Sequence, residues 1–188
     1  MHRYTKLLVS SFFLLLGVVL ATSVLAPSIS TAQDDREEAH KEAVRRVVEE
    51  GYNQGNVDVV DELIAPDYIS YSPGGGEPED LADFKDSIQA FRAALPDLQA
   101  TADPIIAEGD WVAFRFTLTG TFENDLTFAG QDPIPPTGQP FTFSSNILGR
   151  FNEEGLMVEE WDEFDSLTLL FQLGLSPSDL FAEPTEGG

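Results

Sequence analysis

Asp165 is the side chain best placed along the sequence to do chemistry. It ends an acidic, Trp-containing stretch and begins an apolar one, within the run VEEWDEFDSLTLLFQLG at positions 158–174. A carboxylate in apolar surroundings has a raised pKa and can act as a general acid or base near neutral pH. An Asp followed by Ser166 and Leu167 at a helix start is also an ordinary N-cap, which accepts backbone N–H groups of the first turn. The sequence leaves both roles open.

The acidic stretch carries further carboxylates on what alternation predicts to be two faces of one strand. One face carries Glu159, Trp161, Glu163 and Asp165, and the other carries Glu160, Asp162 and Phe164. Successive side chains of a strand point to opposite sides of its sheet. Neither face is apolar, so the pattern does not indicate which one is directed inward.

The remaining inventory excludes several kinds of site. There is no Cys and no G-x-S-x-G motif, and His40 is the one His outside the first six residues. The absence of Cys excludes metal sites built on thiolate, and we expect no nucleophilic triad, no metal site built on imidazole and no cofactor. We expect His40 to be exposed on the first helix. Carboxylate acid/base chemistry remains.

Six polar or aromatic side chains are candidates for substrate binding. They are Tyr52, Tyr71, Trp111, Arg115, Asn146 and Trp161. Arg115 could hold a substrate carboxylate or carbonyl, or it could pair with a structural carboxylate across the sheet. The Tyr hydroxyls could donate to a ligand oxygen, although buried Tyr is also common in cores. Asn146 could face a cavity or solvent.

The elements that must position these groups follow from hydrophobic periodicity. Apolar residues recur every three or four positions in 39–52, 57–64 and 81–95, which predicts three helices. A short extended piece is expected at 68–71, after Pro66 ends the second helix. From residue 101 the period is two, which predicts strands at 101–107, 111–122, 141–151 and 156–164, before a short helix at 167–171. This order predicts an α+β domain whose helices cover one face of a curved sheet.

One strand has a strongly apolar face. In residues 111–122 that face carries Val112, Phe114, Phe116 and Leu118. So apolar a surface must meet either helices or a second subunit. A cavity between helices and sheet would suit a small apolar ligand.

The first 32 residues have the layout of a secretory signal peptide. Arg3 and Lys6 precede an apolar run at 7–20, and small residues follow at 30–32. We therefore expect cleavage before Gln33 and a secreted or periplasmic protein; the alternative is a retained membrane anchor. A polar lead-in at 33–38, one domain at 39–175 and a loose tail at 176–188 complete the predicted organisation.

Charge limits the partners. The 188-residue chain has a formal net charge of −23. Such a surface repels nucleic acid and anionic membranes, so we expect neither as a partner once the leader is removed.

Several short motifs follow one another along the chain: YNQGN at 52–56, LIAPDY at 63–68, LPDL at 95–98, EGDWVA at 108–113, PPTG at 135–138 and the closing Trp161, Asp165 and QLG at 172–174. Together, and in this order, they resemble SnoaL-like polyketide cyclases and related ester cyclases of the NTF2-like fold. The resemblance implies a cone in which a curved antiparallel sheet wraps around three N-terminal helices, with a short C-terminal helix. It also implies a homodimer formed through the sheet.

In those cyclases an acidic residue of the last strand acts as acid/base in an intramolecular aldol ring closure. Asp165, four residues after Trp161, resembles it best, and Asp162 is the second match. The chain departs from the family at Tyr71, where members often carry a His. The predicted ligand is a small apolar carbonyl compound. Three functions remain open: a cyclase- or isomerase-type enzyme, a non-catalytic binder, and a dimerisation module.

Overall fold

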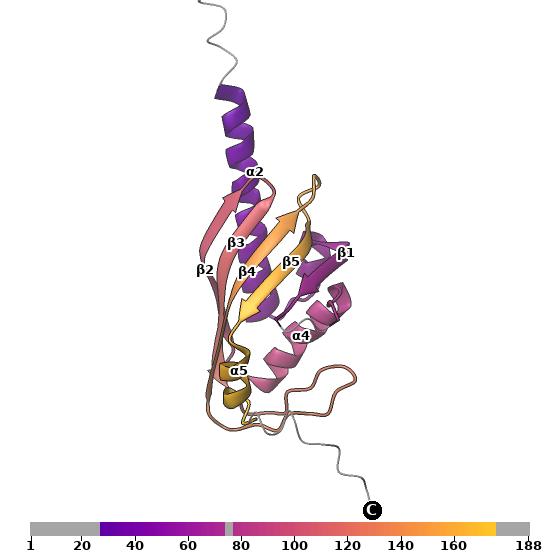
Figure 1. Cartoon of the computed structure of the whole chain (residues 1–188), viewed down its shortest axis with the longest axis vertical. Helices are drawn as coiled ribbons and strands as arrows, with labels where there is room; N and C mark the ends of the chain where they lie inside the picture. Colours follow the sequence, from indigo (N-terminus) through magenta and orange to yellow (C-terminus); the bar gives the residue numbers. More distant parts are fainter. Residues whose placement is uncertain (1–26, 74–76, 176–188) are drawn as a thin grey trace, which may run out of the picture. The chain divides into compact units, whose positions relative to one another are not determined.

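The computed structural model describes residues 27–73 and 77–175 (Figure 1). Most of the predicted signal peptide and the predicted tail at 176–188 lie outside these residues. The chain divides into two compact units at Arg36 and Glu37, and the domain considered below begins at Glu37. None of the described helices is long and apolar enough to span a membrane.

Helices precede most of the strands, as predicted. The helices are α2 (Pro27–Arg46), the π-helical segment η1 (Val47–Asn53), α3 (Val59–Leu63), α4 (Leu81–Ala94) and α5 (Ser166–Gln172). The strands are β1 (Ile64–Tyr71), β2 (Gln99–Glu108), β3 (Trp111–Thr121), β4 (Pro140–Phe151) and β5 (Met157–Phe164). The predicted α+β fold is confirmed.

The strands form one five-stranded sheet in the order β1-β5-β4-β3-β2. Strand β1 runs parallel to β5, and the other neighbours are antiparallel. The sheet is curved and not closed into a barrel, and Figure 1 shows α4 lying beside it. We call the face that meets the helices the inner face and the opposite one the outer face.

The apolar face of β3 belongs to the core. Val112, Phe114, Phe116 and Leu118 are all buried on the inner face, while Trp111, Ala113 and Arg115 between them are exposed. Of the two alternatives left open by the sequence, this face meets helices: Phe116 contacts Tyr52 of η1, with ring centroids 4.9 Å apart. Burial of these side chains supplies most of the driving force that holds the helices on the sheet.

Strand β1 differs from the sequence expectation. It begins at Ile64 and contains Pro66, whereas an extended piece was expected only from residue 68. A Pro is tolerated there because β1 is an edge strand whose pairing with β5 is irregular between Ile64 and Ile69. The missing N–H of Pro66 therefore removes no regular ladder hydrogen bond.

Residues 33–38 also differ, since they are helical within α2 rather than a frayed lead-in. They are rich in helix-forming residues, and Glu38 pairs with Lys41 at 2.6 Å and with Arg45 at 2.8 Å. A pair three residues apart on one helix, such as Glu38–Lys41, adds a few tenths of a kcal/mol, which favours continuation of the helix.

The long connection between β3 and β4 folds back on itself. Backbone hydrogen bonds join Leu126 and Ile134 at 3.0 and 2.9 Å, and Leu126 is buried. Phe128 at its turn packs edge-on against Phe91 of α4, with ring centroids 5.9 Å apart. This segment therefore closes one side of the space between α4 and the sheet.

Candidate functional site

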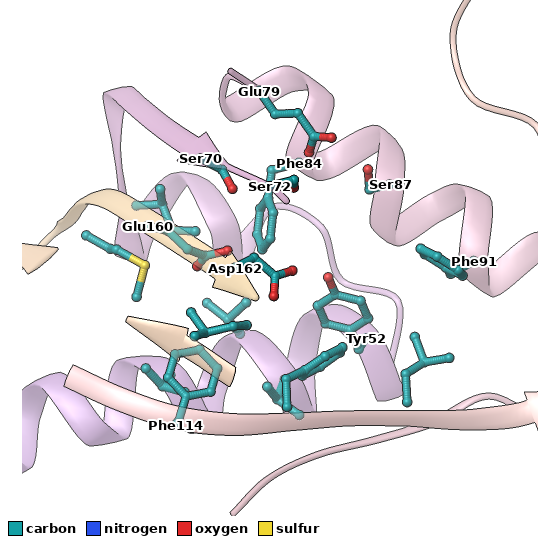
Figure 2. Close-up of a pocket in the computed structure, with 18 of the residues that line it drawn as sticks. Tyr52, Ser70, Ser72, Glu79, Phe84, Ser87, Phe91, Phe114, Glu160 and Asp162 are labelled. Carbon is teal, nitrogen blue, oxygen red and sulfur yellow. The ribbon is translucent and has the colours of Figure 1, made fainter. Parts of the chain in front are cut away.

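A cavity of about 220 Å³ lies between the helices and the inner face of the sheet (Figure 2). Its wall is mainly aliphatic and aromatic. Its polar lining groups are Tyr52, Ser70, Ser72, Glu79, Ser87, Glu160 and Asp162. A small apolar cavity with a few convergent polar groups is the usual form of a small-molecule site.

The register of the sheet directs Glu160 and Asp162 inward. On β4, Gly149 lies opposite Glu160, Ile147 opposite Asp162, and Ser145 opposite Phe164. Ser145 and Ile147 are buried, so their partners on β5 face the same interior. The two carboxyl groups are two residues apart on one strand, which places their Cα atoms about 7 Å apart.

Glu160 is the most enclosed acidic group of the site. Its side chain is only 6% exposed. Burial, with a further contribution from the charge of Asp162, raises the pKa of its carboxyl to about 8, and the nearby Tyr68 hydroxyl offsets part of this rise. Glu160 therefore holds its proton at neutral pH and can donate a hydrogen bond.

Asp162 lies on the same face, nearer to Tyr52 in Figure 2. Burial raises the pKa of its carboxyl to about 6, the Ser145 hydroxyl acts in the opposite direction, and the charge of Glu79 adds to the rise. Its Oδ1 atom is buried without a hydrogen-bond partner among the described residues. At pH 7 Asp162 is mostly ionised yet more basic than an ordinary Asp, which suits a general base.

Tyr52 is brought into the cavity by the π-helical segment η1. Burial, followed by the charges of Glu160 and Asp162, raises its pKa far above the ordinary value. Tyr52 therefore stays a neutral hydroxyl donor across the whole useful pH range. Figure 2 shows its hydroxyl and the Asp162 carboxyl directed into the same space.

Glu79 completes the acidic set from the segment before α4. Its backbone exchanges two hydrogen bonds with Ser70 of β1, at 2.9 and 3.0 Å. The side chain lines the cavity but remains exposed, and partial burial, then the charge of Asp83, raises the pKa of its carboxyl. Glu79 thus lies where the cavity meets solvent.

Asp165, the leading catalytic candidate from the sequence, is the N-cap of α5. It accepts hydrogen bonds from the Leu167 and Thr168 N–H groups, both at 3.1 Å, and from the Thr168 hydroxyl at 2.7 Å. These bonds, the Thr168 hydroxyl first, lower the pKa of its carboxyl. Asp165 is exposed and lines a hollow on the outer face rather than the cavity. Its geometry is that of the capping role.

The structure brings only one of the six candidate binding residues to the cavity, namely Tyr52. The other five project from the outer face. Tyr71 stacks on Trp161 with ring centroids 5.6 Å apart, and Trp111 lies 5.8 Å from Trp161. Arg115 donates to Asn146 Oδ1 at 3.4 Å. These groups are therefore separated from the inner carboxyls by the thickness of the sheet.

His40 is also placed differently from the expectation. It is 1% exposed and stacks on Phe151 of β4, with ring centroids 4.3 Å apart. The expectation of an exposed His40 is wrong, because this side of α2 packs on the sheet.

Glu160, Glu79 and the serines were not predicted from the sequence to be site residues. One signal could have found Glu160: pairing of β3 through β4 to β5 places Phe114, Ile147 and Asp162 in one row. Since Phe114 belongs to an apolar face, Asp162 and its neighbour at 160 must share the interior. Glu79 and the serines come from segments without periodicity, and no sequence signal marks them.

Within residues 27–73 and 77–175, no group of three or more His, Asp or Glu side chains is placed to hold a metal ion. The polar groups of the cavity can therefore act by hydrogen bonding and by proton transfer.

Comparison with known proteins identifies a family. Residues 42–173 match the family described as SnoaL-like polyketide cyclase. No curated protein matches the chain.

Several solved structures resemble the chain. IdmH, a proposed polyketide cyclase from Streptomyces antibioticus, is 33% identical, with 72% of this chain and 99% of that chain covered and a TM-score of 0.56. AclR, a proposed hydroxylase from Streptomyces galilaeus, is 30% identical. The match covers 76% of this chain and 97% of AclR, with a TM-score of 0.57. A proposed polyketide cyclase from Acidithiobacillus ferrooxidans is 28% identical. The match covers 72% of this chain and 94% of that protein, with a TM-score of 0.58.

Proposed function

The chain belongs to the SnoaL-like polyketide cyclase family, and we propose that it moves a proton at the carbon next to a carbonyl group in a small apolar substrate. The observation that carries this proposal is the pair of inner-face carboxyls, Glu160 and Asp162, in an otherwise apolar cavity. Membership of the family supports a small-molecule ligand, and the position of the two carboxyls in the cavity supports their assignment as acid and base.

The two carboxyls have complementary protonation states near pH 7. Asp162, with a pKa of about 6, is ionised and accepts the proton of the C–H bond. The electron pair of that bond moves toward the carbonyl oxygen, which gains negative charge. Glu160, with a pKa of about 8, still carries a proton and donates a hydrogen bond to that oxygen, as does Tyr52. Donors directed at developing charge in a water-poor site lower the barrier.

This proposal assigns the acid/base role to Asp162 rather than to Asp165, the best match by resemblance. Asp165 is exposed and its pKa is lowered, so it is a weak base. Asp162 is the second residue that the resemblance indicates, and it is the one that lines the cavity.

The alternative is a binder that uses the same cavity without catalysis. The family resemblance allows it, because relatives in this fold are assigned different activities: AclR is a proposed hydroxylase and IdmH a proposed cyclase. The two functions differ in one observable, which is exchange of the substrate proton.

The test is deuterium exchange into a neutral ketone such as 2-tetralone, followed by proton NMR in D₂O near neutral pH. The wild-type protein should accelerate loss of the protons next to the carbonyl. Asp162→Asn should reduce that acceleration by about two to four powers of ten. Asp165→Asn, the matched control four residues from Trp161, should keep the rate within about twofold. A ketone that binds without exchange would support the binder, and full exchange by Asp162→Asn would overturn the assigned base.

We also propose that residues 1–32 direct export, which rests on their charged, apolar and small-residue order. N-terminal sequencing of protein from the growth medium or periplasm should find Gln33 first. Material that still begins at Met1 would contradict cleavage.

A further inference from the structure

The cavity has an unusual charge inventory. Three carboxyl groups line it, those of Glu79, Glu160 and Asp162. No Lys, Arg or His is among the described residues that line it. The polar remainder consists of hydroxyl groups, so nothing in the described wall balances a carboxylate charge.

Some outward-facing carboxylates of the domain pair with cations. Glu159, the neighbour of Glu160 in sequence, accepts from Arg150 at 2.7 Å on the outer face. Glu50 pairs with Arg46 at 2.6 Å, and Asp61 pairs with Lys85 at 2.8 Å. These three cations thus pair with outward-facing acids, and among the described residues none lines the cavity beside the inward-facing ones.

One inner carboxyl oxygen is also short of a hydrogen-bond partner. Among the described residues, Asp162 Oδ1 is buried without one, and the Tyr68 hydroxyl near Glu160 forms no hydrogen bond of ordinary geometry. A buried acceptor left without a donor carries a free-energy cost, which is larger when the acceptor is charged. A ligand that brings N–H donors and positive charge would remove this cost.

We infer that the cavity takes an apolar organic amine, whose ammonium group lies between Asp162 and Glu160 and whose hydrocarbon body contacts the aromatic wall. This inference rests on the proposed function, because it names the class of ligand for the same cavity.

The aromatic wall supports an organic cation. Tyr52 lies 4.9 Å from Phe116 and 6.4 Å from Phe84, and Phe143 lies 5.0 Å from Phe164, measured between ring centroids. Ring faces attract cations because the face of an aromatic ring carries partial negative charge. An inorganic cation fits less well, since the described His, Asp and Glu side chains form no cluster suited to a metal.

The inference is tested by calorimetry with three matched probes at pH 7: cyclohexylmethylamine, cyclohexylmethanol and cyclohexanecarboxylate. Their hydrocarbon bodies are nearly the same, so affinity differences report the charged group. The amine should bind about tenfold or more tightly than the alcohol, and the carboxylate should bind most weakly. Equal affinity of amine and alcohol, or tighter binding of the carboxylate, would overturn the inference.

A control is needed because the whole chain is acidic, with a net charge of −23. Glu163→Gln removes an exposed carboxylate from the outer face of the same strand and should leave the preference for the amine unchanged. Asp162→Asn should remove most of it. An equal loss in both variants would assign the preference to the surface rather than to the cavity.

Proton release gives a second signature. Glu160 is protonated in the free protein at pH 7, and an ammonium group beside it favours the ionised form. Binding of the amine should therefore release protons, seen as a binding enthalpy that depends on the ionisation enthalpy of the buffer. The alcohol should release none, and Glu160→Gln should abolish the release. Tight amine binding without proton release would contradict the position given to the ammonium group.

Failure of this inference is distinct from failure of the proposed function. The exchange test uses a neutral ketone, so Asp162-dependent exchange without a preference for amines would leave the proposed function intact. Amine binding without exchange would instead support a binder of amines.

Discussion

The two faces of β5 carry the same kind of side chain and put it to different use. Glu160 and Asp162 point to the inner face, where burial raises the pKa of both carboxyls, to about 8 and about 6. On the outer face Glu159 pairs with Arg150, and Glu163 remains exposed. Immediately after the strand, Asp165 caps α5, which lowers its pKa.

The difference shows that position in the pleat, and not the residue type, decides which carboxylate can act as an acid or base. The inner carboxyls lose the solvation that stabilises their charge, whereas the outer ones keep water or gain a cation. A step of one residue along the strand exchanges these environments. The comparison can be tested by changing matched residues on the two faces.

The largest expected effect contrasts Phe116 with its neighbour Arg115. Phe116 is 5% exposed and contacts Tyr52 and Phe143. Phe116→Ala should lower the free energy of unfolding by about 3 kcal/mol, at the lower end for such changes because the residue already borders a cavity. Arg115→Ala on the outer face should change it by less than about 0.5 kcal/mol. Urea unfolding measures both, and similar losses would contradict the assignment of faces.

The next effect concerns pH and stability. Because the pKa of Glu160 is raised on folding, its favourable contribution is complete below about 4.5 and is lost as the pH rises toward 8. Glu160→Gln cannot ionise and avoids this loss. The variant should match the wild type near pH 4 and become progressively more stable than it as the pH rises through 8. Glu163→Gln is the outer-face control. A constant difference across the pH range would contradict a buried, protonated Glu160.

A smaller effect is expected at Asp165. Asp165→Ala removes the acceptor for two backbone N–H groups and should cost about 1 kcal/mol of stability. Asp165→Asn keeps an acceptor and should cost only a few tenths of a kcal/mol. Thermal unfolding distinguishes them. A large loss in the Asn variant would mean that the charge of Asp165 matters beyond the cap.

The smallest effect on the folding stability of the single chain is expected from a substitution in the outer aromatic group, which is formed by Tyr71, Trp111 and Trp161. Trp111 is 41% exposed, and we propose, as the resemblance implies, that this group lies in a homodimer interface. Trp111→Ser should halve the mass found by light scattering at micromolar concentration. Thr119→Ala, also on the outer face, should not. A monomeric wild type would end the dimer proposal.

Much of the fold could be predicted from local pattern. Short segments are enough to predict the helices from apolar residues every three or four positions, the alternation of β3 and a capping role for Asp165. The inner face of β5 cannot be predicted from a short segment, because it depends on pairing with β4 and, through β4, with β3. With carboxylates on both of its faces, β5 gave no apolar side to orient it.

Two local rules were overridden by tertiary contacts. Pro66 was expected to end a helix before a short extended piece, but the sheet edge accommodates it within β1. His40 was expected in solvent, but packing of α2 buries it on Phe151. The same holds for the five outer-face candidates for substrate binding. They were predicted from residue type alone, and the pairing of the sheet places them away from the cavity.

The most direct test of the account is a pH titration of the carboxyl carbons by NMR, with resonances assigned through Glu160→Gln, Asp162→Asn and Asp165→Asn. The account expects Glu160 to titrate near 8 and Asp162 near 6, while Asp165 titrates below the ordinary range for Asp. Glu160 and Asp162 both titrating at ordinary values near 4 would contradict the acidic cavity, and with it the acid/base role proposed for this face of β5.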